Sequence, residues 1–365
     1  MIKVREAVFE DFEEICTLIG RNYIGARKRS LYEWYHLWKN NHEYLTREQS
    51  WPIGWVLENN RKEIVGFLGN IPVPYEFNGK KIIAAVSSSW TTDKEYRNYS
   101  TLLLKSYFNQ SNCDLFLTTT ANYISENILP IFGSKKIPVT SYDISFFWII
   151  KYRKFFLSAL KKKGFPFGNI ISVPLSLFFH SLDLLKGSHI KKCNIKIHSV
   201  TEIDERFDEF WKHLRKQENY LIQIRDSRYL NWHLKYAGNE NRLWIYLHKN
   251  GPDITSYALF IRQDSPEIGL RRVYLADFQT LDDDYNILAE MINCGIQRCR
   301  EEDIHMLEIV GFNLQKKKTV MKLLPHKRKL ESWPFFYKAN NPHLAEKLEN
   351  PDIWDPCLLD GDATF

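Results

Sequence analysis

The sequence has few cysteines, and none of them is placed as metal ligands usually are. Its six cysteines are scattered over 365 residues, without a Cys-x-x-Cys pair or a cluster of cysteine and histidine. Zinc sites draw on such closely spaced ligands, so a metal site is not expected. The N-terminal stretch MIKVREAVFEDFEEI is charged and has no apolar signal core, which predicts a cytoplasmic protein with reduced thiols.

Long uncharged apolar runs are also absent. The two most apolar stretches, residues 144–165 and 169–187, are interrupted by Lys, Arg, Asp, His or Pro, which argues against a membrane span. Neither sign of charge dominates, because 50 basic residues stand against 44 acidic ones and give a net charge of +6. No motif of an RNA-binding sheet is present, so no nucleic-acid partner is expected. Aromatic residues are abundant instead, and we expect most of them in packed cores.

The chain repeats a pattern of elements at about half its length. Residues 2–15 and 195–211 each combine a short alternating strand with the start of an acidic, amphipathic helix. Residues 55–71 and 244–263 each contain a strand, a polar turn and a second strand, which predicts two hairpins. Both halves then continue with alternating strands and helices.

This duplication predicts an α/β (α+β) fold of two tandem domains, each a mixed, mainly antiparallel sheet flanked by helices. The predicted divisions are an N-terminal domain over residues 1–150, a basic and apolar connector over 151–192, a C-terminal domain over 193–340 and a tail over 341–365.

The order of the elements resembles the GNAT superfamily of acyl-CoA acyltransferases. It is most similar to two-domain members associated with bacterial polysaccharide and cell-envelope biosynthesis. The resemblance depends on residues 63–105, on RDSRYLNWHL from Arg225 and on the tail WDPCLLDGD from Trp354, and it covers nearly the whole chain. It implies two GNAT-like domains and an acyltransferase, in the first place an acetyltransferase. Acetyl-CoA or another acyl-CoA would be the co-substrate.

Members of this superfamily hold the pyrophosphate of coenzyme A on backbone N–H groups at a helix N-terminus. Their turn reads Arg/Gln-x-x-Gly-x-Gly/Ala, and Arg97, Ser100 and Leu102 take its key positions here. Serine replaces the first glycine, and Leu102 is bulkier than the family pattern. The strands over residues 85–92 and 115–122 are expected to separate and leave room for the pantetheine arm. The cofactor-binding residues that the resemblance implies are Ser88, Trp90, Arg97, Asn98, Tyr99, Ser100, Thr101, Leu102 and Asn122.

Acyl transfer needs a base for the attacking group and a proton donor for the leaving thiolate. The family commonly uses a carboxylate and a tyrosine for these roles. The tyrosine position falls near Leu129 here, and the strand over residues 85–92 has no carboxylate. Tyr123 and Glu126 are therefore the expected catalytic residues.

The second half is expected to bind the acceptor and not coenzyme A. The start of its helix carries Asp282, Asp283 and Asp284, whose charges would repel a pyrophosphate. Aromatic and charged side chains suit a sugar or another cell-envelope precursor, which would bind between the two domains. The predicted acceptor-binding residues are Arg225, Asp226, Tyr229, Trp232 and His233, with helix packing as the open alternative for Tyr229 and Trp232.

Other interpretations stay open. The fold could persist without catalysis, as a binding protein in polysaccharide assembly, or it could serve an aminoacyl-tRNA-dependent peptidyltransferase. The connector mixes Phe with Lys and Arg, so a linker packed across both domains, which is the preferred interpretation, competes with peripheral contact to an anionic membrane. The acyl group, the acceptor and the choice of nitrogen or oxygen are not specified by the sequence.

Overall fold

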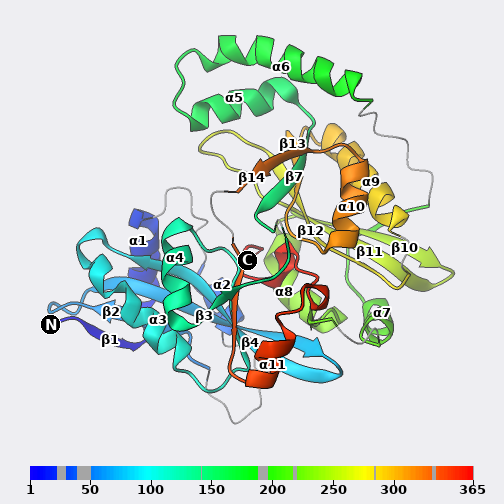
Figure 1. Ribbon diagram of the computed structural model, residues 1–365. Coiled ribbons are helices and arrows are strands. Elements are labelled where there is room, and N and C mark those ends of the chain that lie inside the picture. Colours follow the sequence, from blue (N-terminus) through cyan, green and yellow to red (C-terminus); the bar gives the residue numbers. More distant parts are fainter. Residues whose placement is uncertain are drawn as a thin grey trace.

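The protein consists of two β-sheets that lie beside each other and are flanked by helices (Figure 1). The computed structural model describes residues 1–22, 30–38, 51–140, 142–187, 196–216, 220–282, 285–330 and 334–364. The pairing is mainly antiparallel in both sheets, with one parallel pair in each. The predicted α/β fold of two tandem, mainly antiparallel sheets is confirmed.

The first sheet is built mostly from the N-terminal half. Its strands, in spatial order, are β1 (Lys3–Glu6), β2 (Gly54–Glu58), β3 (Ile64–Phe77), β4 (Lys80–Thr92), β5 (Leu115–Thr118), β15 (Phe336–Ala339) and β6 (Lys135–Lys136), and β9 (Ile222–Gln223) also pairs with β3. The β3–β4 hairpin turns at Asn78 and Gly79, both with positive φ, as their Asn-Gly sequence predicts.

The second sheet repeats this arrangement with strands that come mostly from the C-terminal half. Their spatial order is β14 (His326–Lys329), β7 (Ile144–Ile149), β13 (Met306–Ile309), β12 (Arg272–Thr280), β11 (Asp253–Arg262), β10 (Leu243–Asn250) and β8 (His198–Val200).

The two halves exchange a strand. β7 follows the first half in sequence but pairs with β13 and β14, while β15 from the second half pairs with β5 and β6. The predicted boundaries at residues 150 and 340 therefore do not separate one sheet from the other. Whether residues 1–150 and 193–340 form separate domains stays a prediction.

The helices cover the faces of the sheets, except for one pair that projects outward. The helices are α1 (Phe12–Asn22), α2 (Leu31–Trp38), α3 (Ser100–Phe108), α4 (Tyr123–Ile128), α5 (Tyr152–Lys162), α6 (Gly168–Leu185), α7 (Arg206–Leu214), α8 (Ser227–Asn239), α9 (Asn286–Glu301), α10 (Leu314–Lys322) and α11 (Pro342–Lys347). Short 3-10 helices are η1 (Phe9–Asp11), η2 (Lys94–Tyr99), η3 (Leu129–Phe132), η4 (Pro351–Ile353) and η5 (Leu358–Asp360).

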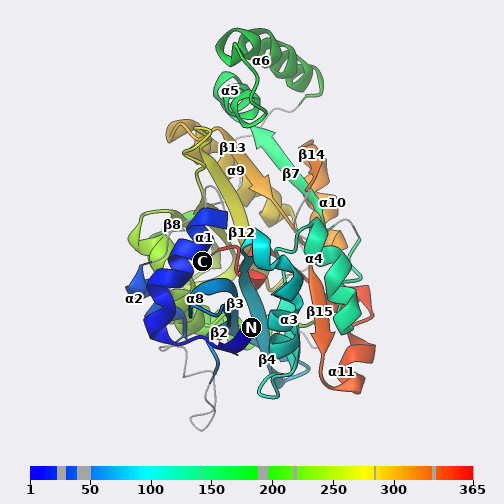
Figure 2. The ribbon, with the colours of Figure 1, turned by 90° about the vertical axis from the view of Figure 1, so that its left-hand side faces the viewer.

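The described part of the predicted connector, residues 151–187, forms a hairpin of α5 and α6, and residues 188–192 lie outside the described residues. Figures 1 and 2 both place this hairpin at the end of the molecule that is farthest from the first sheet. The preferred prediction of a linker packed across both domains is therefore wrong. α6 is long and apolar enough to cross a membrane by length and composition, although the sequence argued against a span.

Candidate active site

Two neighbouring strands of the first sheet separate partway along their length. β4 and β5 pair in parallel from Ala84–Leu115 to Val86–Leu117, and β5 ends one residue later while β4 continues to Thr92. A hydrogen bond of 2.9 Å from Ser87 Oγ to Thr118 Oγ1 joins the strands one residue beyond their last paired positions. The predicted separation is present at this place.

A β-bulge in β4 accompanies the divergence. The pairing of β4 with β3 shifts between Gly69–Ser88 and Phe67–Thr91, and Ser89 adopts a positive φ of 54°. Such bulges bend a strand and redirect its side chains. The bulge therefore lies at the place where β4 stops pairing with β5.

A cavity of about 340 Å³ lies where β4 and β5 diverge. Small hydroxyl side chains from both strands contribute to its wall, as expected for a space that admits a thin ligand arm. The lining residues are Ile19, Leu68, Ser87, Ser88, Ser89, Trp90, Leu104, Thr118, Thr120, Ala121, Asn122, Ser125, Leu129 and Asp362.

Helix α3 follows β4 after the 3-10 helix η2 and is anchored where β4 and β5 stop pairing. Tyr107 is fully buried, and its hydroxyl donates to the carbonyls of Ala85 on β4, at 2.6 Å, and Leu117 on β5, at 3.1 Å. Burial raises the pKa of the Tyr107 hydroxyl, so it remains a donor. This contact fixes α3 against both strands.

The turn before α3 is exposed to solvent. Arg97, Asn98 and Tyr99 are exposed, and neither η2 nor α3 has a side-chain cap at its N-terminus. Leu102 is 37% exposed, so part of its side chain faces solvent. A helix N-terminus of this kind attracts anions through its N–H groups and its dipole.

The predicted cofactor-binding residues divide between these two places. Ser88, Trp90 and Asn122 line the cavity, while the run from Arg97 to Leu102 forms the turn. Asn122 also has a structural role, since its Oδ1 accepts hydrogen bonds of 2.9 Å from the N–H groups of Ile124 and Ser125 at the start of α4. Binding of acyl-CoA by these residues stays a prediction.

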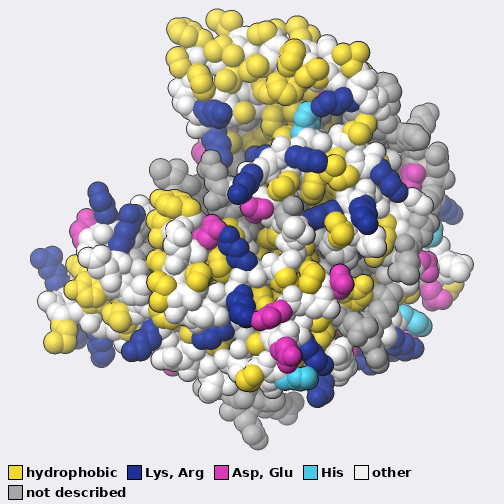
Figure 3. Space-filling model, viewed as in Figure 1, with side chains coloured by type: hydrophobic (Ala, Val, Ile, Leu, Met, Phe, Trp, Pro, Cys, Tyr) yellow, Lys and Arg dark blue, Asp and Glu magenta, His cyan; other side chains and the backbone are white. Residues whose placement is uncertain are grey.

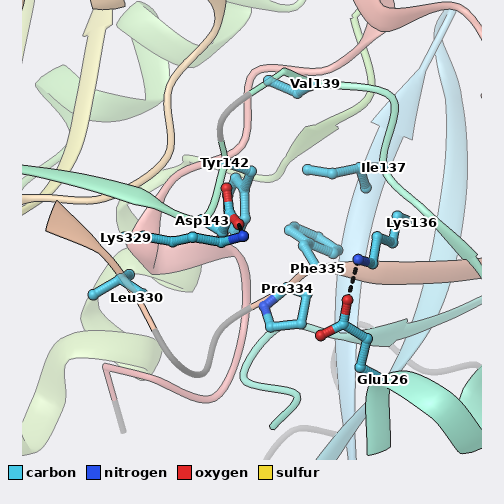
Figure 4. A pocket seen from close by; sticks show the side chains of 10 residues that line it. All are labelled: Glu126, Lys136, Ile137, Val139, Tyr142, Asp143, Lys329, Leu330, Pro334 and Phe335. Carbon is cyan, nitrogen blue, oxygen red and sulfur yellow. Dashed lines mark hydrogen bonds and ion pairs between the residues drawn. The ribbon is translucent and has the colours of Figure 1, made fainter. Parts of the chain in front are cut away.

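The two predicted catalytic residues do not line this cavity. Tyr123 is 69% exposed on α4, and Glu126 forms an ion pair with Lys136. Figure 4 shows Glu126 and Lys136 facing each other beside a different cavity of about 500 Å³. Ser125 of the same helix lines the first cavity, so α4 contributes to the walls of both cavities. The geometry therefore does not favour Tyr123 or Glu126 as the base.

A carboxylate in the first cavity comes from the C-terminal tail. The Oδ1 atom of Asp362 accepts hydrogen bonds from Thr119 Oγ1, at 3.3 Å, and Thr120 Oγ1, at 3.0 Å. Asp362 also lines the cavity. Asp362 is not among the site residues predicted from the sequence, although it belongs to the tail WDPCLLDGD that contributed to the resemblance. Because 242 residues separate Asp362 from Thr120, only the fold brings them together.

An ion pair with Arg225 positions the tail beside this cavity. Arg225 is fully buried, and its guanidinium contacts Asp277 of β12 at 2.8 Å and Asp360 of the tail at 3.2 Å. Although burial lowers the pKa of Arg225, the charges around it, Asp277 first among them, raise the pKa above its ordinary value. Burial also raises the pKa of Asp360, to about 6. The carbonyl of Asp360 accepts a further bond of 2.8 Å from the Tyr75 hydroxyl on β3.

The residues predicted to bind the acceptor form a buried network instead. Asp226 caps α8 by accepting from the N–H group of Tyr229 at 2.7 Å. Tyr229, Trp232 and His233 are buried, and His233 Nε2 lies 2.6 Å from Thr364 Oγ1 of the tail. With Arg225 also buried, these side chains offer no surface to a substrate. The structure favours helix packing for Tyr229 and Trp232, and positioning of the tail for Arg225 and His233.

The parallel strand pair of the second sheet corresponds to β4 and β5 of the first. The space beside it is largely filled by the chain itself. β12 and β13 pair in parallel, and the tail lies against both, with the Phe312 N–H donating to the carbonyl of Pro356. Lys316 forms an ion pair with Asp355 of the tail. A cavity of about 260 Å³ remains, lined among others by Asp282. Asp283 and Asp284 lie outside the described residues. The aspartates at the start of the helix were expected to repel a pyrophosphate by their charge. The contacts of the tail add a steric obstacle to its binding.

Within the described residues, no group of three or more His, Cys, Asp or Glu side chains could hold a metal ion.

Comparison with known proteins gives no match to a family model and none to a curated protein. Solved structures do match. The N-myristoyltransferase of Saccharomyces cerevisiae with bound myristoyl-CoA superposes with a TM-score of 0.56 at 12% identity, over 100% of this chain and 83% of that one.

GCN5-related N-acetyltransferases from Anabaena variabilis and Kribbella flavida give TM-scores of 0.54 and 0.53 at 12% and 9% identity. They cover 93% and 96% of this chain and 73% of each of theirs. At such low identity the likeness establishes the fold. The chain has a tandem GNAT-like fold, as the sequence predicted.

Proposed function

We propose that this chain is an acyl-CoA-dependent N- or O-acyltransferase of the GNAT type, with acetyl-CoA as the first donor to test. The observation that carries the proposal is the cavity between β4 and β5, because the strand pair is open there and the carboxylate of Asp362 lines it. The exposed N-terminus of α3 follows β4 in sequence, after η2. The similarity in fold to acetyltransferases and to an N-myristoyltransferase that binds myristoyl-CoA supports it.

In this proposal the thioester lies between β4 and β5, and the pyrophosphate of coenzyme A lies at the N-terminus of α3. Arg97 adds a positive charge beside the phosphates. The donor supplies an activated carbonyl carbon, which the acceptor attacks. A new C–N or C–O bond forms, the C–S bond breaks, and the thiolate leaves with the electron pair.

Asp362 would act as the general base and take the proton from the attacking amine or hydroxyl. Its Oδ1 atom is oriented by Thr119 and Thr120, which is the kind of support that a positioned base requires. The thiolate then takes up this proton from the Asp362 carboxyl, so that the reaction releases neutral coenzyme A thiol and restores the base.

For the acceptor we propose a sugar or another cell-envelope precursor in the cytoplasm, bound in the cavity beside Glu126. Charged side chains at both sides of this cavity, Glu126 and Lys136 at one and Asp143 and Lys329 at the other, suit a polar acceptor (Figure 4). The cavity draws residues from both halves of the chain, in keeping with an acceptor between the domains.

Calorimetric titration with acetyl-CoA tests the proposal, together with an assay for released thiol. We expect binding, and we expect Arg97→Ala to weaken it by about 1–3 kcal/mol, as loss of a hydrogen bond to a charged group does. Unchanged affinity in this variant would show that the phosphates bind elsewhere. The absence of binding at millimolar acetyl-CoA would reject the proposal. Binding without turnover for any acceptor would favour the inactive binding protein.

A further inference from the structure

The hairpin of α5 and α6 exposes a large apolar surface to solvent. Its most exposed residues recur at helical spacing along the outer side of α6, so they form one continuous stripe. Exposed apolar side chains of the hairpin are Phe165, Phe167, Ile170, Ile171, Val173, Leu177, Phe178, Leu184 and Leu185. Figure 3 shows these apolar atoms gathered over the end of the molecule that the hairpin forms. Soluble monomers rarely leave such a patch uncovered.

The hairpin also carries a concentrated positive charge. Residues 151–187 contain seven lysines and arginines and a single acidic residue, Asp183. The whole chain has 50 basic and 44 acidic residues, so the part outside the hairpin balances at 43 of each. The net charge of the protein is thus the net charge of this one element.

The one acid of the hairpin faces inward. Asp183 accepts a hydrogen bond of 2.6 Å from the Tyr152 hydroxyl, and its Oδ2 atom lies 2.8 Å from His326 Nε2 of β14. The ring of Phe155 stacks on Phe147 of β7. These contacts fix the hairpin to the second sheet and leave its outer surface apolar and basic.

Although α6 is long enough to cross a bilayer, the topology excludes a span. A single crossing by α6 would place the chain before it and the chain after it on opposite sides. β7 precedes the hairpin and β8 follows it, yet both strands belong to the second sheet. α5 cannot supply a return crossing, since its 11 residues include Arg153, Lys154, Lys161 and Lys162.

We propose that the α5–α6 hairpin docks this protein on an anionic membrane surface, with α6 lying in the plane of the interface. The apolar stripe would enter the boundary between headgroups and acyl chains. The lysines at 161–163 and at 186 would remain at the level of the acidic headgroups. This inference goes beyond the proposed acyl transfer and does not depend on it. It would bring the active site to acceptors held at a membrane.

Flotation of the full-length protein with vesicles tests this inference. The vesicles contain phosphatidylcholine, with or without phosphatidylglycerol, and binding is measured at low and at high salt. We expect binding to the vesicles that contain phosphatidylglycerol, weakened by salt. Replacing the lysines at 161–163 by glutamine is expected to lower the bound fraction at least about tenfold, because each cation near an anionic surface contributes to attraction.

A matched pair of substitutions separates docking from general hydrophobicity. Leu177 of the hairpin and Leu314 at the start of α10 are both 63% exposed. Leu177→Asp is expected to reduce binding about tenfold or more, since it would place a charge where the leucine enters the membrane. Leu314→Asp is expected to bind as the unaltered chain does. Circular dichroism confirms that both variants are folded.

Three outcomes would overturn the inference. The first is no flotation with either kind of vesicle. The second is equal binding by Leu177→Asp and Leu314→Asp. The third is a dimer in solution that Leu177→Asp dissociates while vesicle binding is absent, which would assign the patch to a second copy of the chain. Titration with acetyl-CoA is independent of all three, so failure here leaves the proposed function standing.

Discussion

At the scale of single residues, the feature with the most direct chemical consequence is the carboxylate of Asp362. Two threonine hydroxyls hold its Oδ1 atom, and it lines the cavity between the diverging strands. We expect Asp362→Asn to lower the turnover number by about 100-fold or more, since a positioned base contributes roughly that much. Asparagine keeps the shape of the side chain, so the affinity for acetyl-CoA should change little. Titration and a thiol-release assay measure the two effects.

Asp352 provides a control for this substitution. It lies in the same tail but is exposed in η4, away from the cavity. Asp352→Asn should leave both affinity and turnover at their original values. If Asp362→Asn keeps full turnover, the base lies elsewhere and Asp362 serves only to fix the tail.

His233 makes stability depend on pH. Burial lowers its pKa to about 3, whereas an unfolded histidine has a pKa of about 6.5. Between these values the unfolded chain binds a proton that the folded chain does not, so the free energy of unfolding falls as the pH decreases. For one proton, the free energy of unfolding changes by about 1.4 kcal/mol per pH unit. The loss between pH 6.5 and 5 is therefore about 2 kcal/mol.

Denaturation with urea at pH 7 and pH 5 measures this loss. For the unaltered chain we expect the free energy of unfolding to fall between pH 7 and pH 5. For His233→Gln this fall should be smaller by about 2 kcal/mol. The exposed residue His343 supplies the control variant His343→Gln. Equal differences for all three proteins would contradict a neutral, buried His233.

At the scale of elements, the tail depends on close contact with the loop after β5. A Cβ atom added to Gly361 would lie 1.8 Å from Thr119 Oγ1 and 2.6 Å from Thr119 Cβ, which forces the tail or the loop to move. Gly361→Ala should therefore destabilise the fold by about 1–3 kcal/mol, as overpacking does. It should also reduce turnover by displacing Asp362. Denaturation and the thiol-release assay test both effects.

Gly20 of α1 is the matched control, because an added Cβ there meets no atom within 4 Å. Gly20→Ala should be neutral or slightly stabilising in a helix. A fully active Gly361→Ala protein would show that the tail tolerates displacement.

The local elements could be predicted from the sequence, and their long-range partners could not. Asn78 and Gly79 specify a tight turn by their own backbone preferences, and the hydroxyl residues at 87–89 predict a strand with room beside it. The sequence of β7 gives no sign that it pairs with β13, because a strand's pattern records burial and not the identity of its neighbour. The prediction that Arg225 binds the acceptor was misplaced for the same reason. A charged residue next to aromatic ones suits a ligand site, and equally suits a buried ion pair.

At the scale of the whole molecule, the exchanged strands and the tail join the two sheets into one structure. β7 and β15 each complete the sheet of the other half, and the tail contacts Asp277 of the second sheet through Arg225 before it reaches Thr119 beside the first. Neither sheet keeps all its strands without the other half of the chain. The protein is therefore expected to unfold as one cooperative unit, unlike two domains joined by a linker.

Arg225→Met tests this coupling. The substitution leaves Asp277 and Asp360 buried without their cation, and loss of one partner from a buried ion pair costs about 3–5 kcal/mol. Because β7 and β15 still pair with strands of the other half, the variant should show a single urea transition at a lower midpoint. Circular dichroism and tryptophan fluorescence should report the same midpoint, since both halves contain buried tryptophans. Two separate transitions in the variant, or a midpoint that differs between the probes, would mean that each half is stable alone and that the exchanged strands add little to the coupling.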